Sequence, residues 1–158
     1  MKPNRENLHA SVLDRLVDNE PKQSHEPVHY RLVNINQIKT AVIRDLEQLL
    51  NTKRQIFEAP PAYREVNNSL FVYGLQDYTA LNPRSKSVRN QLRQDIEKSI
   101  ARFEPRIKNL TVQFEMPDQK ERNLRFRITG MLVIEPAQEP IAFDTYFDVS
   151  RGEYRISE

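Results

Sequence analysis

A chain of 158 residues is long enough for one domain and can bury roughly two-thirds of the surface that its unfolded form exposes. Its 24 basic and 22 acidic side chains nearly cancel, so the formal charge of +2 excludes the strong field that sequence-independent binding of nucleic acid or anionic membranes requires. The absence of cysteine excludes disulfides, thiol nucleophiles and thiolate metal sites, and with no apolar signal segment at the N-terminus we expect a cytoplasmic protein without a membrane span.

The first predicted helix lies near the N-terminus, where Ser11 and Asp14 resemble a capping box. So short a helix is marginal alone in water, so we expect it to dock on the body of the protein or on a partner. Its candidate docking residues, at helical spacing, are Val12, Leu13, Leu16 and Val17. The polar residues 18–29 contain two prolines and no periodicity, which indicates a flexible linker. We therefore predict a helix and linker in residues 1–34 and one domain in residues 35–158.

Two strong amphipathic helices are predicted, at 37–50 and 86–103. The apolar stripe of the first consists of Ile38, Val42, Leu46, Leu49 and Leu50, and that of the second consists of Val88, Leu92, Ile96, Ile100 and Phe103. Between them, residues 55–68 contain Pro60 and Pro61 and are typical of a loop. The stretch SLFVYGLQDYTALNP at 69–83 predicts a brief helix or an extended turn.

Alternation of apolar and polar residues predicts strands at 109–116, 122–134 and 141–149, and YRIS at 154–157 adds a last short strand. Polar turns (PDQKE, EPAQEP, SRGE) separate them. The residues expected to point to one side are Leu110, Val112, Phe114, Leu124, Phe126, Ile128, Ile141, Phe143, Phe147 and Val149. Helices first and an antiparallel meander second predict an α+β fold, with the two main helices packed on a three- to four-stranded antiparallel sheet.

A zinc site is the first chemical hypothesis to test, because residues 25–29 have the letters of the H-E-x-x-H signature. That chemistry needs His25 and His29 on one helical face, and Pro27 opposes a helix there at a cost of ~3 kcal/mol. His9 is the only further histidine. The linker interpretation is favoured, and we expect no metal and no cofactor.

A cell-wall glycoside hydrolase is the alternative function, with Glu104 as general acid. A general acid needs a raised pKa, and Arg106 beside it would do the reverse. Asp144 and Asp148 lie on the polar side of a strand, where alternation alone explains them. The sequence does not favour catalysis.

Nucleic-acid binding is a third hypothesis, since LRFRI at 124–128 interleaves arginine with phenylalanine. Alternation directs Phe126 toward the core and Arg125 and Arg127 away from it. A buried ring provides no stacking platform, so we expect no nucleic-acid partner.

FEPRI at 103–107 joins the second helix to the first strand. Pro105 disfavours helical geometry at Glu104, so the helix should end at about Phe103. In an extended segment Glu104 and Arg106 project to the same side. Two interpretations stay open, namely an intramolecular brace and a docking fork that reaches outward to grip another protein.

Four stretches extend the interpretation: SVLDRLVD (11–18), VIRDLEQLLNTKR (42–54), SLFVYGLQDYT (69–79) and IARFEPRIKNLTV (100–112). Together they resemble the TssE family of type VI secretion baseplate subunits, which belongs to the phage tail baseplate wedge proteins sometimes called lysozyme-like. Ile107 stands where that family commonly has leucine.

The resemblance implies a non-enzymatic component of a contractile injection machine, assembled in the cytoplasm with TssF, TssG and TssK and docked at the inner face of the cytoplasmic membrane. It implies that Glu104, Pro105 and Arg106 form a partner-binding motif at the wedge core. By analogy with sheath subunits, an edge of the sheet would receive strands from the first ring of TssB and TssC. No nucleic acid, small-molecule substrate or direct membrane insertion is expected.

Overall fold

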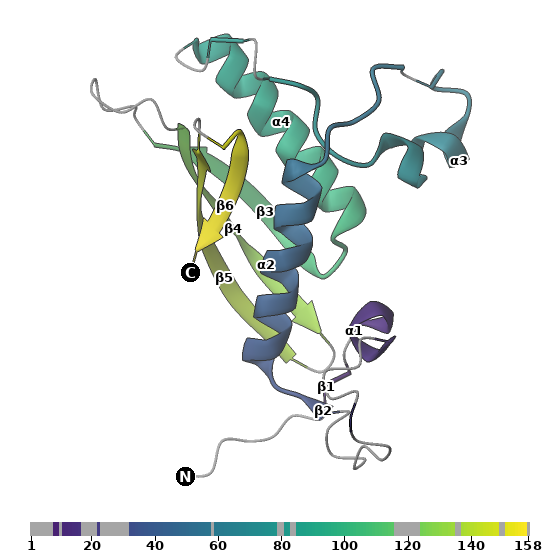
Figure 1. Cartoon of the computed structure of the whole chain (residues 1–158), viewed down its shortest axis with the longest axis vertical. Helices are drawn as coiled ribbons and strands as arrows, with labels where there is room; N and C mark the ends of the chain where they lie inside the picture. Colours follow the sequence, from purple (N-terminus) through teal and green to yellow (C-terminus); the bar gives the residue numbers. More distant parts are fainter. Residues whose placement is uncertain are drawn as a thin grey trace.

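The computed structural model describes residues 8–9, 11–16, 22, 32–57, 59–78, 81–82, 85–115, 124–134, 137–148 and 151–157. Two long helices, α2 (Ile35–Asn51) and α4 (Lys86–Phe103), pack against one face of a four-stranded sheet (Figure 1). The strands are β3 (Ile107–Phe114), β4 (Leu124–Ile134), β5 (Ala137–Asp148) and β6 (Glu153–Ser157), each antiparallel to the next. The predicted α+β fold is confirmed.

The core lies between the helices and the sheet, because the apolar stripes face the apolar side of the strands. All five stripe residues of α2 are buried, as are Leu92, Ile96 and Ile100 of α4. From the sheet, Val112, Phe126, Ile128 and Phe143 are nearly inaccessible to solvent. Burial of apolar side chains on this scale stabilises the fold at ~1.5–3 kcal/mol for each large residue.

Helix α2 begins two residues earlier than the sequence pattern predicts, because a capping box sets its start. The Asn34 side chain accepts a hydrogen bond from the Gln37 backbone N–H at 2.8 Å, and the Gln37 side chain accepts one from the Asn34 N–H at 2.9 Å. The pair satisfies N–H groups that have no partner within the helix.

The predicted turn at 135–140 is wrong beyond residue 136, since β5 begins at Ala137 and Pro140 pairs with Met131. Proline has no N–H to donate to a sheet, so it is tolerated where a strand has a free side. In the pairing register β6 contacts only Asp144–Asp148 of β5. The first half of β5 therefore lies beyond the end of β6 and accommodates Pro140.

Side chains of the helices bind the backbone of the two outer strands. Asn51 of α2 accepts from the Tyr154 N–H at 2.7 Å and donates to its carbonyl at 3.0 Å, and Glu47 accepts from the Ile156 N–H at 2.9 Å. On the other side, Glu97 of α4 accepts from the Val112 N–H at 3.1 Å. These bonds satisfy groups that an outer strand otherwise presents to solvent or to another chain.

The N-terminal part contains α1 (Val12–Leu16), whose start is fixed by the Ser11–Asp14 pair. Strand β1 (Leu8–His9) pairs with β2 (Leu32–Val33), a short contact that the linker interpretation did not predict. Val17, the H-E-x-x-H letters at 25–29 and Val149 lie outside the described residues.

Two short elements occur between α2 and α4: α3 (Arg64–Asn67) and the 3-10 helix η2 (Leu70–Val72). The predicted loop at 55–68 thus contains a helical turn, and η2 is the brief helix predicted within 69–83. None of the helices in the described part of the chain is long and apolar enough to cross a membrane.

Candidate functional site

The FEPRI segment forms a tight connection between α4 and β3, which we call the elbow (residues 104–106). Helix α4 ends at Phe103 as predicted, and the Glu104 N–H still donates to the Ile100 carbonyl at 2.8 Å. The Ile107 N–H donates back to the Glu104 carbonyl at 3.1 Å. The Arg106 carbonyl accepts from the Val133 N–H of β4 at 2.8 Å. The backbone of the elbow is therefore fixed on both sides.

The acid and the base of the elbow bind each other, as their spacing predicts. Arg106 donates from Nε and from Nη2 to the two carboxylate oxygens of Glu104, at 2.5 Å each. Nη2 also donates to Oδ2 of Asp45 on α2 at 2.7 Å. Such paired, charge-assisted bonds fix the guanidinium in one orientation.

The expectation that both charges reach outward is wrong for Glu104. Its residue is 4% exposed, whereas the Arg106 side chain is 24% exposed and Pro105 lies at the surface. Glu104 comes directly after the buried end of α4, and Arg106 covers it. The brace interpretation therefore describes Glu104, and only Pro105 and part of Arg106 are accessible to another protein.

The ion pair extends into a chain of alternating charges that the sequence did not reveal. Asp45 also accepts from Arg44 at 2.9 Å, and Arg44 donates to Asp14 of α1 at 2.8 Å. We call Glu104, Arg106, Asp45, Arg44 and Asp14 the charge chain. Asp45 and Arg44 lie on the polar side of a predicted helix, but only the packing of α2 beside the elbow shows that they belong together.

Three groups of the charge chain are stabilised in their charged forms by the contacts within it. The hydrogen bond with Glu104 raises the pKa of Arg106, and bonds with Asp14 and Asp45 raise that of Arg44. Burial alone would raise the pKa of Asp14, but hydrogen bonds from Ser11 and Arg44 outweigh it and hold that pKa below its usual range. At neutral pH these three groups are therefore charged.

An aromatic pair lies beside the elbow. Tyr73 packs edge-to-face on Phe103, with ring centroids 5.0 Å apart. Burial, and then the charges of Asp45 and Glu104, raise the pKa of Tyr73. The segment that follows η2 is therefore in contact with the elbow.

The candidate docking helix α1 buries none of its residues, and Val12, Leu13 and Leu16 are all more than half exposed. An ion pair from Asp14 to Arg44 joins it to α2. These three side chains are thus at the surface, and docking of the helix on a partner stays a prediction.

The outer face of the sheet carries Asp144, considered for catalysis, and Arg125 and Arg127, considered for nucleic-acid binding. Phe126 is buried as alternation predicts, and Arg127 binds Asp144 through Nε at 2.5 Å and Nη2 at 3.0 Å. That bond lowers the pKa of Asp144, which is the reverse of what a general acid requires.

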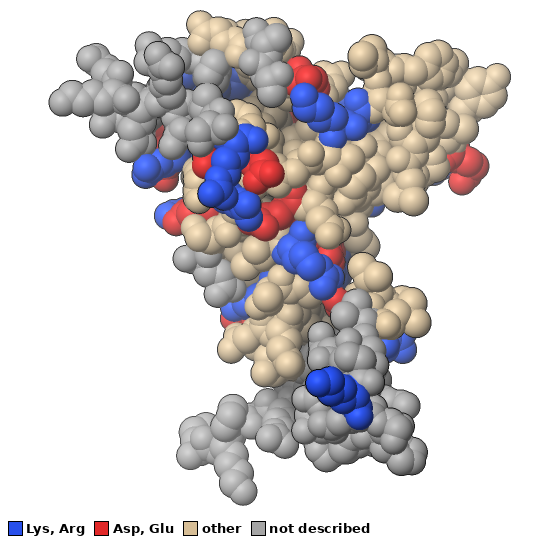
Figure 2. Space-filling view, viewed as in Figure 1, with Lys and Arg blue, Asp and Glu red and all other residues tan. Residues whose placement is uncertain are grey.

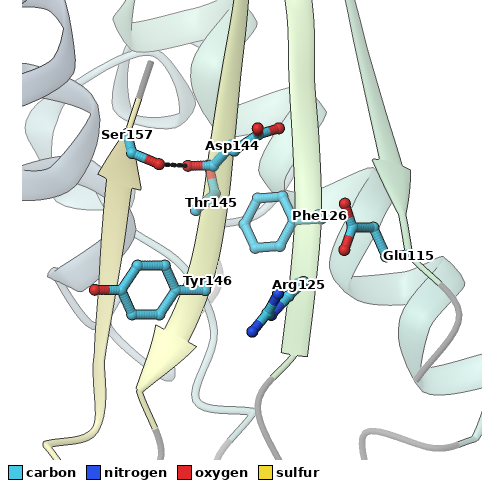
Figure 3. Close-up of a pocket in the computed structure, with 7 residues that line it drawn as sticks. All are labelled: Glu115, Arg125, Phe126, Asp144, Thr145, Tyr146 and Ser157. Atoms are coloured by element: carbon cyan, nitrogen blue, oxygen red, sulfur yellow. Dashed lines mark hydrogen bonds between the residues drawn. The ribbon is translucent and has the colours of Figure 1, made fainter. Parts of the chain in front are cut away.

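A pocket of about 360 Å³ opens on this face (Figure 3). Its lining consists of Glu115, Arg125, Phe126, Asp144, Thr145, Tyr146 and Ser157. The described residues contain no group of three or more histidine, aspartate and glutamate side chains that would hold a metal ion. The pocket offers polar contacts on a sheet surface, separate from the elbow.

Comparison with known proteins places most of the chain in a known family. The family model described as baseplate wedge protein gp25 matches residues 36–137, a span that contains all of α2 except its first residue, together with α4, β3, β4 and the whole elbow. A search of curated proteins found no match.

Proposed function

The chain belongs to the baseplate wedge protein gp25 family, and from that premise we propose that it is the TssE-type subunit of a type VI secretion baseplate. Membership makes it a structural component of a phage-type baseplate, with other baseplate proteins as partners. The four stretches at 11–18, 42–54, 69–79 and 100–112 support the narrower assignment. In this proposal the subunit acts in the cytoplasm, at the inner face of the membrane, and joins a wedge of TssF, TssG and TssK to the first sheath ring of TssB and TssC.

The observation that carries the proposal is the pattern of hydrogen bonds made by the Arg106 guanidinium group. Within the described residues, the hydrogen bonds of its side chain use Nε and Nη2. Nη1 remains for a carboxylate or a carbonyl group of a wedge subunit, and Pro105 presents a rigid apolar contact beside it. Because Glu104 and Asp45 hold the guanidinium in place, little side-chain entropy is lost on binding.

The sheath would add a strand to the first half of β5, which lies beyond β6. On β6, Tyr154 and Ile156 direct their backbone N–H groups toward α2. The backbone groups of the alternating residues Glu153, Arg155 and Ser157 therefore point toward β5. Along β5 the direction of the backbone groups repeats every second residue. Pro140 and Ala142 therefore point to the same side as Asp144, and at their positions that side is free. Ala142→Pro removes an N–H from that side and should weaken sheath attachment, whereas Ala142→Ser retains the N–H and should not.

No catalytic role is part of the proposal, because the Glu104 carboxylate is engaged by Arg106 and is suited to accept hydrogen bonds. Purified protein incubated with peptidoglycan should release no soluble fragments. Release that disappears in Glu104→Gln would identify a hydrolase instead.

The experiment is co-purification with TssF and TssG homologues from the same organism. Arg106→Lys keeps a positive charge next to Glu104 but loses the planar set of donors, so recovery of the complex should fall while the melting temperature stays near that of the parent. Arg127→Lys, the same change in an exposed ion pair, is the matched control. Full recovery with Arg106→Lys, or no complex with the parent chain, would refute the proposal.

A further inference from the structure

A long loop, residues 55–72, projects from the body beside α4 and carries α3 near its tip (Figure 1); we call it the arm. Backbone hydrogen bonds join the two chain segments at its base. The Arg54 N–H donates to the Leu75 carbonyl at 2.7 Å, and the Leu75 N–H donates to the Thr52 carbonyl at 2.9 Å. Arg54 also binds Asp95 of α4 at 2.9 Å. Loops longer than about 12–15 residues are uncommon in compact domains, and functional binding loops are one of the classes in which they occur.

The arm exposes an unusual amount of apolar surface. Helix α3 buries no residue and η2 buries only Val72. The Phe57 and Phe71 rings meet edge-to-face with centroids 6.1 Å apart, which makes the surface continuous between the two sides of the loop. The exposed apolar residues of the arm are Ile56, Phe57, Tyr63, Val66, Leu70 and Phe71, of which Ile56 is 100% and Leu70 79% exposed.

The size of this surface indicates the kind of occupant. At their exposed fractions, the three aromatic side chains alone present roughly 250–400 Å², and the three aliphatic ones add to it. The largest apolar patch on an ordinary monomer is about 300–600 Å², whereas a stable interface buries about 800 Å² on each partner. The arm thus exposes, in its aromatic side chains alone, roughly as much as the largest patch of an ordinary monomer and roughly a third to a half of one side of a stable interface. It suits a partner that also binds elsewhere on the molecule.

The base of the arm lies beside the elbow in the fold. Tyr73 comes directly after η2 and packs on Phe103, the residue before Glu104. The residue after the arm thus contacts the residue before the elbow, which places the arm and Arg106 within reach of one bound protein.

The charge of the arm defines the chemistry of the contact. The arm has three charged residues among its 18, namely Glu58, Arg64 and Glu65. Figure 2 shows this part of the molecule almost entirely in the colour of uncharged residues. A partner surface that fits it is apolar and bare of charge at its centre.

We infer that the arm is a second contact surface for the wedge subunit that binds the elbow, and that this subunit covers it with an apolar, uncharged surface. The inference rests on the proposed function and adds a site that the elbow does not include. Because the contact is apolar, its contribution to affinity should not depend on salt, unlike that of Arg106.

The test measures the affinity of a purified complex of the TssF and TssG homologues for immobilised chain by surface plasmon resonance. Ile56→Ser and Leu70→Ser should each weaken binding about 10- to 100-fold, with the same ratio at about 0.1 M and about 1 M salt. Tyr63→Ser on the arm should also weaken binding, and Tyr146→Ser on the outer face of the sheet, a matched change at another exposed tyrosine, should not. Because these side chains are exposed, melting temperatures should stay unchanged.

Each other outcome is informative. If the parent chain binds and the arm variants bind equally well, the inference is overturned and the proposed function stands. If the parent chain does not bind, both fail. If the isolated chain sediments as a dimer that Leu70→Ser converts to a monomer, the occupant is a second copy and the inference is overturned as well.

Discussion

Replacing Arg106 by alanine tests the energetics of the charge chain. The substitution removes every side-chain hydrogen bond between Arg106 and the carboxylates of Glu104 and Asp45. The Glu104 side chain, 5% exposed, is then left as a buried charge without its cation. Breaking a buried pair on one side costs ~3–5 kcal/mol, a large share of the ~5–15 kcal/mol that holds a typical domain folded.

The assay is thermal and urea unfolding followed by far-ultraviolet circular dichroism. For a chain of this size the loss corresponds to a fall of about 6–20 °C in the melting temperature. Arg127→Ala is the control, since Arg127 and Asp144 are both 51% exposed and such surface pairs contribute ~0–1 kcal/mol. Adding Glu104→Gln to Arg106→Ala should restore part of the stability, because a neutral amide is less costly to bury than a carboxylate.

Equal losses of less than ~1 kcal/mol for Arg106→Ala and Arg127→Ala would refute this reasoning. So would a double variant that is less stable than Arg106→Ala alone. Either result would mean that Glu104 does not depend on Arg106 for its place in the fold.

Two further predictions concern the fold. Gly74→Ala should destabilise the protein by more than Gly152→Ala. A Cβ on Gly74 would lie 2.3 Å from a backbone oxygen, whereas a Cβ on Gly152 meets no atom within 4 Å. Equal losses of stability in urea unfolding would contradict this prediction. Burial raises the pKa of Tyr78 to about 12 and also raises the pKa of Tyr154. The stability that these two neutral side chains confer is therefore complete below pH ~10, the pKa of tyrosine in the unfolded chain, and is lost as the pH rises toward 12. Tyrosinate absorbance should then appear together with unfolding, and full ionisation of the folded protein near pH 10 would be the contrary result.

The main helices and strands could be predicted because short-range patterns of apolar and polar residues indicate them. The stripes of α2 and α4 and the alternation of β3 to β6 depend on periods of 3.6 and 2, which any packed layer of helices on a sheet requires. Pro105 likewise fixed the end of α4 without any knowledge of the rest of the chain. The turn predicted at Pro140 was wrong because whether a proline fits into a strand depends on the neighbouring strand, and the local sequence contains no information about that neighbour.

The candidate site was predictable in part. The pairing of Glu104 with Arg106 follows from their spacing, but the burial of Glu104 and the bonds from Asp45 to Arg44 and Asp14 arise from packing between segments far apart in the sequence. The apolar side chains of the arm were also visible in the sequence. Only the fold shows that they are exposed together instead of buried in the core.

The most direct test of the account places a photo-crosslinking amino acid at position 105, the exposed tip of the elbow, and irradiates the chain in the presence of purified TssF and TssG homologues. Pro105→p-benzoylphenylalanine should give a covalent product with one of them, and the same amino acid in place of Tyr146 should not. A product at position 146 with none at position 105 would contradict the claim that the elbow is the surface through which this subunit joins the wedge.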